Sequence, residues 1–166
     1  MYVFVNVNVN PNAANQPFVI RDSIKIEWNG NTSFKQLEAW GQNANYIRST
    51  VLQGNFSWNK TRPYVILGGL IVDTNSVLTI QPGTRIYLNA DAPFIVDGTL
   101  IVNGTKSDSV VFRGNRLDDP YKDYPGAWPG IYFRGSSINN NLTYTYISNA
   151  YQGLVVEKPA TNANPK

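Results

Sequence analysis

The chain has 166 residues, of which 42% are hydrophobic, and its 14 Lys and Arg against 11 Asp and Glu give a net charge of +3. This composition fits one ordinary domain, or a small domain and part of another, with a buried core. The basic residues are scattered singly, which argues against nucleic acid as a partner. Because the chain has no Cys and no His, Ser-His-Asp and Cys-His nucleophiles, Cys or His zinc sites and disulfides are excluded.

The apolar stretches of the sequence are short, and none approaches the roughly 18 residues that cross a bilayer. We therefore expect no membrane span in this segment. The first residues, "MYVFVNVNVN", lack the basic flank, the longer apolar core and the cleavage site of a signal peptide. They indicate instead a strand from the interior of a longer protein.

Taken in chain order, the first elements are predicted to be strands. Residues 2–9 alternate apolar and polar side chains with period two, and the Asn- and Pro-rich residues 10–17 predict a loop. "FVIRDSIKIEW" predicts a strand pair or one bent strand, and the following "NGN" predicts a hairpin turn. "EAWG" is interpreted as strand, because its segment is too short for a stable helix and Gly41 ends it.

The pieces "VNVNVNP", "DSIKIEWNGN" and "KQLEAWGQNA" together resemble the closing strands of immunoglobulin-like domains of the ASPM-SPD-2-Hydin group, found in large surface proteins. The resemblance implies that residues 1–50 are the C-terminal strands of such a domain, whose earlier strands this chain lacks. Residues 51–62 are then expected to be a linker.

The sequence pattern changes at about residue 62, where short apolar strands begin to alternate with turns of two to six residues. Three apolar pairs recur after about 24 residues, each keeping its large side chains on alternate positions. They are Leu70 and Val72 with Phe94 and Val96, Leu78 and Ile80 with Leu100 and Val102, and Ile86 and Leu88 with Val110 and Phe112.

Such a repeat predicts a parallel β-helix, because a single rung has an apolar inner face that only a stacked neighbour can bury. Glycines 83, 98 and 104 are expected at the corners. "GIYF", "LTYTYI" and "GLVV" predict a further rung, which gives about three rungs over residues 63–157 and a polar tail at 158–166. An antiparallel sandwich also has short alternating strands, but the matched triplet favours the β-helix.

The stretches "PYVILGGLIVDTNSVLTIQPGTRIYL", "FIVDGTLIVNGT" and "ISNAYQGLVV" resemble right-handed parallel β-helix proteins of the pectin-lyase-like type. The nearest subgroup comprises large secreted, often lipid-anchored, surface proteins of Gram-negative bacteria. The resemblance implies an all-β fold and a place at the cell surface or outer membrane. Many of these proteins have no assigned activity, so function has to be argued from the site.

One segment, "RGNRLDDPYKDYPGAWPG" at residues 113–130, interrupts the rungs and is the candidate ligand-binding loop. Its carboxylates could hold Ca²⁺, Arg or Lys beside Asp could serve a polysaccharide lyase, and its aromatic rings could stack on sugars. Alternatively, Trp and Tyr cover the interrupted edge of the rungs. The candidates are Arg116, Asp118, Asp119, Tyr121, Lys122, Asp123, Tyr124 and Trp128.

Two further patterns concern the surface. Tyr87 and Tyr132 are expected to point outward from neighbouring rungs, where they could form a sugar platform or stiffen the sheet. "DSI" and "DSV" resemble the Asp-Ser-aliphatic acceptor of O-glycosylation in some Gram-negative surface proteins, which implies Ser23 and Ser109 as modification sites.

The sequence thus predicts a non-catalytic structural or adhesive module of a larger secreted, cell-surface protein or outer-membrane complex. The alternative is a carbohydrate-binding or lyase-like, polysaccharide-processing module. No catalytic residue and no cofactor are predicted, with Ca²⁺ as the one candidate ion. The expected partners are the remainder of a longer chain and other surface proteins, outer-membrane proteins or glycans.

Overall fold

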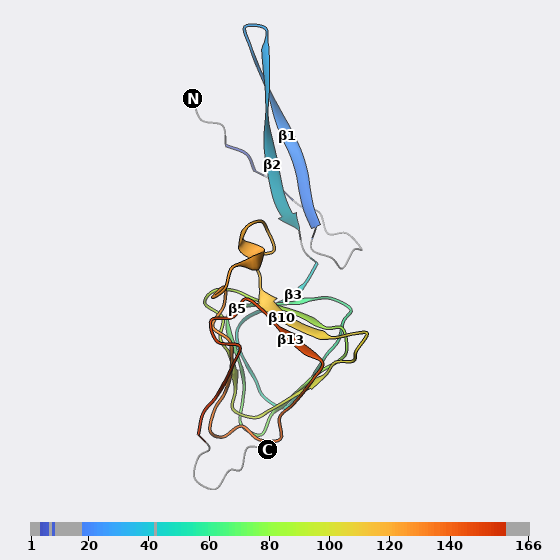
Figure 1. The fold of residues 1–166 in the computed structure, drawn as a ribbon, viewed down its shortest axis with the longest axis vertical. Helices are drawn as coiled ribbons and strands as arrows, with labels where there is room; N and C mark the ends of the chain where they lie inside the picture. Colours follow the sequence, from blue (N-terminus) through green and yellow to red (C-terminus); the bar gives the residue numbers. More distant parts are fainter. Residues whose placement is uncertain (1–3, 7, 9–17, 42, 159–166) are drawn as a thin grey trace. The chain divides into compact units, whose positions relative to one another are not determined.

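The computed structural model describes residues 4–6, 8, 18–41 and 43–158, and the chain forms two compact units, residues 1–43 and residues 44–166 (Figure 1). Each unit is described by itself. Within the described residues, none of the helical structure has the length and apolar character needed to cross a membrane.

The first unit contains a β-hairpin of β1 (Phe18–Trp28) and β2 (Asn31–Gly41), which pair antiparallel along their whole length. Asn29 and Gly30 connect them with φ angles of 43° and 78°, the left-handed pair that a two-residue hairpin turn requires. The predicted "NGN" hairpin and the strand at "EAWG" are confirmed. Residues 4–6 and 8 of the predicted first strand have no regular secondary structure, and its other residues lie outside the described ones.

The immunoglobulin-like assignment stays a prediction, because the described residues of the first unit form this one hairpin.

The second unit is a parallel β-helix, and every strand pair in it is parallel. Its strands are β3 (Asn45–Leu52), β4 (Asn55–Trp58), β5 (Tyr64–Val72), β6 (Val77–Ile80), β7 (Arg85–Leu88), β8 (Phe94–Val96), β9 (Thr99–Asn103), β10 (Val110–Gly114), β11 (Ile131–Phe133), β12 (Asn141–Thr143), β13 (Thr145–Ile147) and β14 (Leu154–Val156). Figure 1 shows the coils stacked around one interior. The right hand of the coil stays a prediction.

Three faces enclose the interior. Face A consists of the first halves of β3 and β5 with β7, β10 and β13, and face B of their second halves with β8, β11 and β14. Face C consists of β4, β6, β9 and β12. β3 and β5 belong to two faces because the chain bends within them, where Ser49, Gly68 and Gly69 have φ angles of 41°, 73° and 106°.

The strands form five coils, so the predicted number of about three rungs is wrong. Coil 1 is β3 and β4, coil 2 is β5 and β6, and coil 3 is β7 to β9. Coil 4 is β10 to β12, and coil 5 is β13 and β14. Coil 1 occupies residues 45–58, in the range predicted as the domain end and linker. The sequence did not reveal coil 1, because a coil at the end of the stack has few buried neighbours and its apolar alternation is therefore weak.

The last two coils were merged in the prediction for a local reason. "LTYTYI" was interpreted as one strand, but Tyr144 has a φ angle of 42° and turns the chain from face C to face A. β12 therefore closes coil 4 and β13 opens coil 5.

The register of the repeat is confirmed on two faces and corrected on the third. Leu70 pairs with Phe94 on face B, and Leu78 pairs with Leu100 on face C, as predicted. On face A, Ile86 pairs with Phe112 instead of Val110. The turn between β9 and β10 is longer than the corresponding turn between β6 and β7. A shift of two residues leaves the apolar alternation of a strand unchanged, so the sequence pattern did not show it.

The inward side chains of coils 2 and 3, on all three faces, fill the interior and are almost completely buried. Burial of each such Leu, Ile or Phe contributes about 1.5–3 kcal/mol. Phe94 and Phe112 meet edge to face across the interior, with ring centroids 5.6 Å apart. Gly98 is confirmed as a corner residue, because a Cβ there would overlap the carbonyl oxygens of Asp73 and Ser76. The coils thus form a rigid frame for the loops at their corners.

Candidate functional site

The candidate site is the insert, residues 115–130, which joins β10 to β11 and carries a short 3-10 helix, η1 (Tyr121–Asp123). In Figure 1 it is the orange loop that leaves the outline of the coils. Two side chains of the frame fix it. Arg113 donates from Nη2 to the carbonyl of Lys122 (2.7 Å), and Asn149 donates from Nδ2 to the carbonyls of Lys122 and Tyr124 (3.0 Å each). The insert is therefore held in a defined shape.

Two ion pairs lie within the insert. The Arg116 guanidinium donates from Nε and Nη2 to both oxygens of Asp118, at 2.8 and 2.6 Å. This hydrogen-bonded pair lowers the pKa of Asp118 and raises that of Arg116. The ammonium of Lys122 lies 2.7 Å from Oδ1 of Asp119, whose hydrogen bond raises the pKa of Lys122. Each of these charges thus has a partner inside the loop.

The three carboxylates of the insert do not converge on one point. Asp118 and Asp119 face different cations, and no group of three or more acidic side chains able to hold a metal ion occurs among the residues that the structure describes. Ca²⁺ prefers six to eight oxygen ligands. The structure therefore does not bring Asp118, Asp119 and Asp123, the candidate calcium ligands, together.

The aromatic residues of the insert fall into two sets. Tyr121 and Tyr124 are 44% and 51% exposed, and their rings meet edge to face at 5.6 Å. The Arg116 guanidinium carbon lies 4.0 Å from the centroid of the Tyr121 ring, within the range of a cation–π contact. The two tyrosines thus present ring surface to solvent with their orientation partly fixed.

Trp128 belongs to the second set, because its side chain is only 1% exposed. Its Nε1 donates to the carbonyl of Ser148 (2.8 Å), and its backbone forms a parallel bridge with Ala150. Since the ring is part of the core, it cannot stack on a ligand in this structure. Trp128 therefore has the packing role that the sequence left as the alternative.

Two residues that position the insert were not among the sequence candidates. Arg113 is an outward residue of β10, and the alternation of that strand could have identified it as available to a loop. Asn149 lies far from the insert in sequence and has a φ angle of 61°. Asn tolerates this left-handed conformation, but the presence of an Asn does not by itself predict it. Only the stacking of coil 5 on coil 4 brings its amide to the loop.

Tyr87 and Tyr132 do not form a shared platform. Tyr87 lies on face A, where it pairs with Arg113 and Val65, whereas Tyr132 lies on face B between Ile95 and Val155. Burial of Tyr87 raises the pKa of its phenol, although Arg85 and Arg113 act in the opposite direction. The two tyrosines lie on neighbouring coils, as expected, but on different faces, so their rings cannot form one sugar platform.

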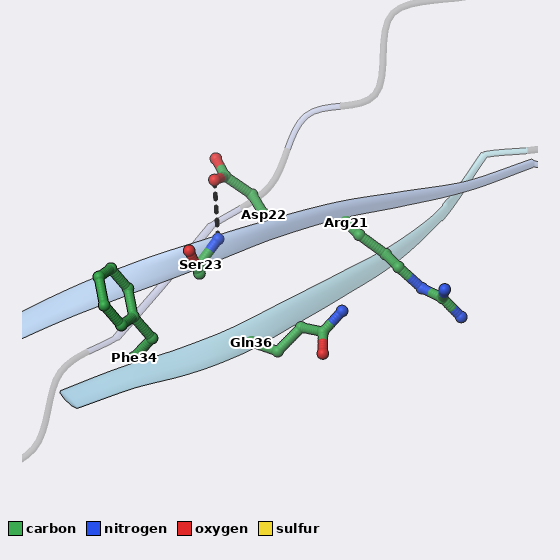
Figure 2. Close-up of a pocket in the computed structure, with 5 residues that line it drawn as sticks. All are labelled: Arg21, Asp22, Ser23, Phe34 and Gln36. Carbon is green, nitrogen blue, oxygen red and sulfur yellow. Dashed lines mark hydrogen bonds between the residues drawn. The ribbon is translucent and has the colours of Figure 1, made fainter.

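The predicted modification sites are accessible. Ser23 lies in β1, beside a shallow depression of about 490 Å³ lined by Arg21, Asp22, Ser23, Phe34 and Gln36. Figure 2 shows these side chains along the hairpin, with the Ser23 N–H donating to Oδ1 of Asp22 at 2.7 Å. Ser109 is exposed immediately before β10. Glycosylation of both residues stays a prediction.

The fold and the insert define a parallel β-solenoid that displays a long corner loop. Residues 50–155 match the family described as "pectate-lyase like beta helix domain", and the chain belongs to this family. Comparison with curated proteins and with solved structures finds no match to the chain. The family confirms the parallel β-helix; what the loop recognises has to be argued from its own residues.

Proposed function

We propose that this chain is a non-catalytic solenoid module of a larger secreted surface protein, in which the β-helix presents the insert as a preorganised recognition loop. One observation carries the proposal. The charged side chains Arg116, Asp118, Asp119 and Lys122 are paired with one another, while Arg113 and Asn149 hold the loop backbone. Such a loop is shaped for binding at little cost in entropy.

The same pairing argues against catalysis. A general base works best when its pKa lies near the operating pH. Asp118 has the opposite tendency, because the hydrogen bonds of Arg116 lower its pKa and keep it ionised. Its partner cation is committed to the same pair, so neither group is free to neutralise a uronate or abstract its proton. The fold itself remains compatible with a polysaccharide lyase.

The wider setting extends the proposal. The family and the sequence resemblance both support a surface protein. We place it at the outer membrane of a Gram-negative bacterium, with an immunoglobulin-like domain before the β-helix. Its partners are then the remainder of the longer chain and other proteins or glycans of the cell surface.

A second function, carbohydrate binding, is favoured by Tyr121 and Tyr124. Two exposed rings with centroids 5.6 Å apart and planes at 68° can each pack against the apolar face of a sugar residue, and the Arg116 guanidinium lies over the first ring. The chemistry needs no metal and no acid–base pair. It would make the glycan the ligand of the recognition loop.

A binding and turnover assay tests both functions. The chain is applied to a glycan array, and the affinity for any bound polysaccharide is compared with that of Tyr121→Ala/Tyr124→Ala. A tenfold or larger loss, about 1.4 kcal/mol, supports carbohydrate binding by the insert. Tyr151→Ala is the control, because Tyr151 is exposed but lies outside the insert.

The other outcomes are equally informative. If no polysaccharide binds, the proposal of carbohydrate binding is rejected, and a protein is then the expected partner of the loop. If the chain releases unsaturated uronate products from a polysaccharide, the non-catalytic proposal is overturned.

A further inference from the structure

The sequence contains two Asn-Gly pairs, Asn29–Gly30 and Asn103–Gly104, and the structure places them in opposite surroundings. The side-chain amide of such an Asn is open to attack by the next backbone nitrogen, because glycine has no side chain to shield that nitrogen. The attack closes a ring, and it requires the peptide unit between the two residues to rotate. The local structure therefore decides whether an Asn-Gly pair reacts.

Asn29 and Gly30 form the exposed tip of the β1–β2 hairpin. All residues from 25 to 32 are exposed, and a Cβ at Gly30 would meet no described atom within 4 Å beyond its chain neighbours. The ladder ends with the pair of Trp28 and Asn31, so the N–H of Gly30 lies outside it. Backbone hydrogen bonds at the exposed end of a two-stranded ribbon open easily. The Asn29–Gly30 peptide unit is therefore free to rotate whenever the tip opens.

Asn103 is exposed as well, but Gly104 is buried where β9 ends. The N–H of Gly104 donates to the carbonyl of Thr143 at 2.9 Å. A Cβ at Gly104 would overlap the carbonyl oxygens of Thr143 and Tyr144, so the backbone that ends coil 4 lies directly against this glycine. Rotation of the Asn103–Gly104 peptide unit would break this hydrogen bond and displace β12 from β9. The stacking of the coils thus protects the second pair.

We propose that Asn29 is a site of spontaneous deamidation, a covalent change of the first unit from which the β-helix is protected. The Gly30 nitrogen attacks Cγ of Asn29. The new N–Cγ bond replaces the bond from Cγ to Nδ2, and the proton of the Gly30 N–H leaves with the side-chain amide as ammonia. Water then opens the cyclic imide. Cleavage at Cγ gives aspartate, and cleavage at the main-chain carbonyl carbon of residue 29 gives isoaspartate.

The two products affect the hairpin differently. Both add one carboxylate, which lowers the net charge of +3 by one. Aspartate preserves the turn, because Asp also tolerates the left-handed φ of 43° at this position. Isoaspartate adds a methylene to the backbone of a two-residue turn, which then no longer fits the pairing of Trp28 with Asn31. The insert is not involved, so this inference is independent of the proposed function.

Mass spectrometry follows the two pairs separately. The folded chain is incubated at mildly alkaline pH and digested with trypsin, which releases residues 26–35 and 86–106 as two peptides with one Asn-Gly pair each. Deamidation raises the peptide mass because a hydroxyl replaces the amide NH2, and fragmentation of the peptide assigns the change to one residue. Asn29 should be converted at least tenfold faster than Asn103.

The same chain incubated in urea is the matched control. Without the coils, both pairs lie in unfolded backbone and should react at similar rates. Ion-exchange chromatography gives the second readout, since each modified molecule is more acidic. Asn29→Asp carries the aspartate product from the start, so it should elute with the deamidated wild type and show no further acidic shift while the wild type acquires one.

Equal rates at Asn29 and Asn103 in the folded chain would overturn the proposal, because the structure would then not discriminate between the two pairs. An unmodified Asn29 in the folded chain, after the chain in urea has been converted, would also overturn it. That result would show that the closed turn protects the first pair.

Discussion

The indole of Trp128 lies against Gly114, with its Cδ1 3.9 Å from the position that a Cβ of Gly114 would take. Gly114 pairs with Leu88, which in turn pairs with Ile66, so it continues an inward column of face A without a side chain of its own. The insert returns to the frame at this point. Ala127 and Trp128 together occupy the space that glycine leaves, and the loop is thereby anchored in the core.

The first prediction concerns this space. Gly114→Ala should lower the free energy of unfolding by about 1–3 kcal/mol, because its Cβ would stand 2.7 Å from Cβ of Ala127. Denaturant unfolding measures the change. Gly153→Ala is the matched control, since its Cβ would meet only Cγ2 of Ile147 at an ordinary 3.9 Å. Equal losses in the two variants would contradict the packing described for Gly114.

Trp128→Ala should be more damaging, with a loss of about 3–5 kcal/mol in the free energy of unfolding. The change removes a buried ring and leaves the carbonyl of Ser148 without the indole N–H. Thermal and denaturant unfolding give the value. Tyr151→Ala, at an exposed neighbouring position, should change stability by no more than about 0.5 kcal/mol. A Trp128→Ala protein of wild-type stability would show that the ring is not part of the core.

The Arg116–Asp118 pair should be visible in the titration of Asp118. Because Arg116 lowers the pKa of Asp118 in the folded state, the pair contributes stability above the pKa of the unfolded chain, about 3.9. That contribution is lost as the pH falls through the folded pKa. Carbon-13 NMR of the carboxyl group should give a pKa below 3.8, and Arg116→Gln should raise it. An unchanged pKa in Arg116→Gln would show that the pair does not persist in solution.

At alkaline pH the ionisation of Tyr87 should lower the free energy of unfolding as the pH rises. Burial raises its folded pKa above the ordinary value of 10.0, so its phenol contributes no pH dependence below that value. Above pH 10 the unfolded chain ionises more readily, and stability falls as the pH rises through the folded pKa. The difference in unfolding free energy between the wild type and Tyr87→Phe, measured from pH 8 to 11, should be constant at first and then shift in favour of Tyr87→Phe. A constant difference throughout would contradict the buried phenol.

Much of the fold followed from local patterns. The hairpin was predictable because Asn29 and Gly30 are the residue types that adopt left-handed φ without penalty. The columns of Leu70 with Phe94 and of Leu78 with Leu100 were predictable because each coil repeats the same inward positions. The insert was predicted correctly as a loop that interrupts the rungs, since a long polar stretch cannot belong to a rung; its role as a binding site stays a prediction.

The sequence by itself therefore determined the parallel β-helix, because period-two alternation and stacking of like side chains depend on the chain alone. Only the tertiary structure decided the number of coils, the burial of Trp128, the separation of the three carboxylates of the insert and the hydrogen bonds from Asn149 to the insert. These are contacts between residues far apart in sequence. No local sequence pattern shows that Asn149 will lie beside the insert, since the distance between them is set only when coil 5 stacks on coil 4.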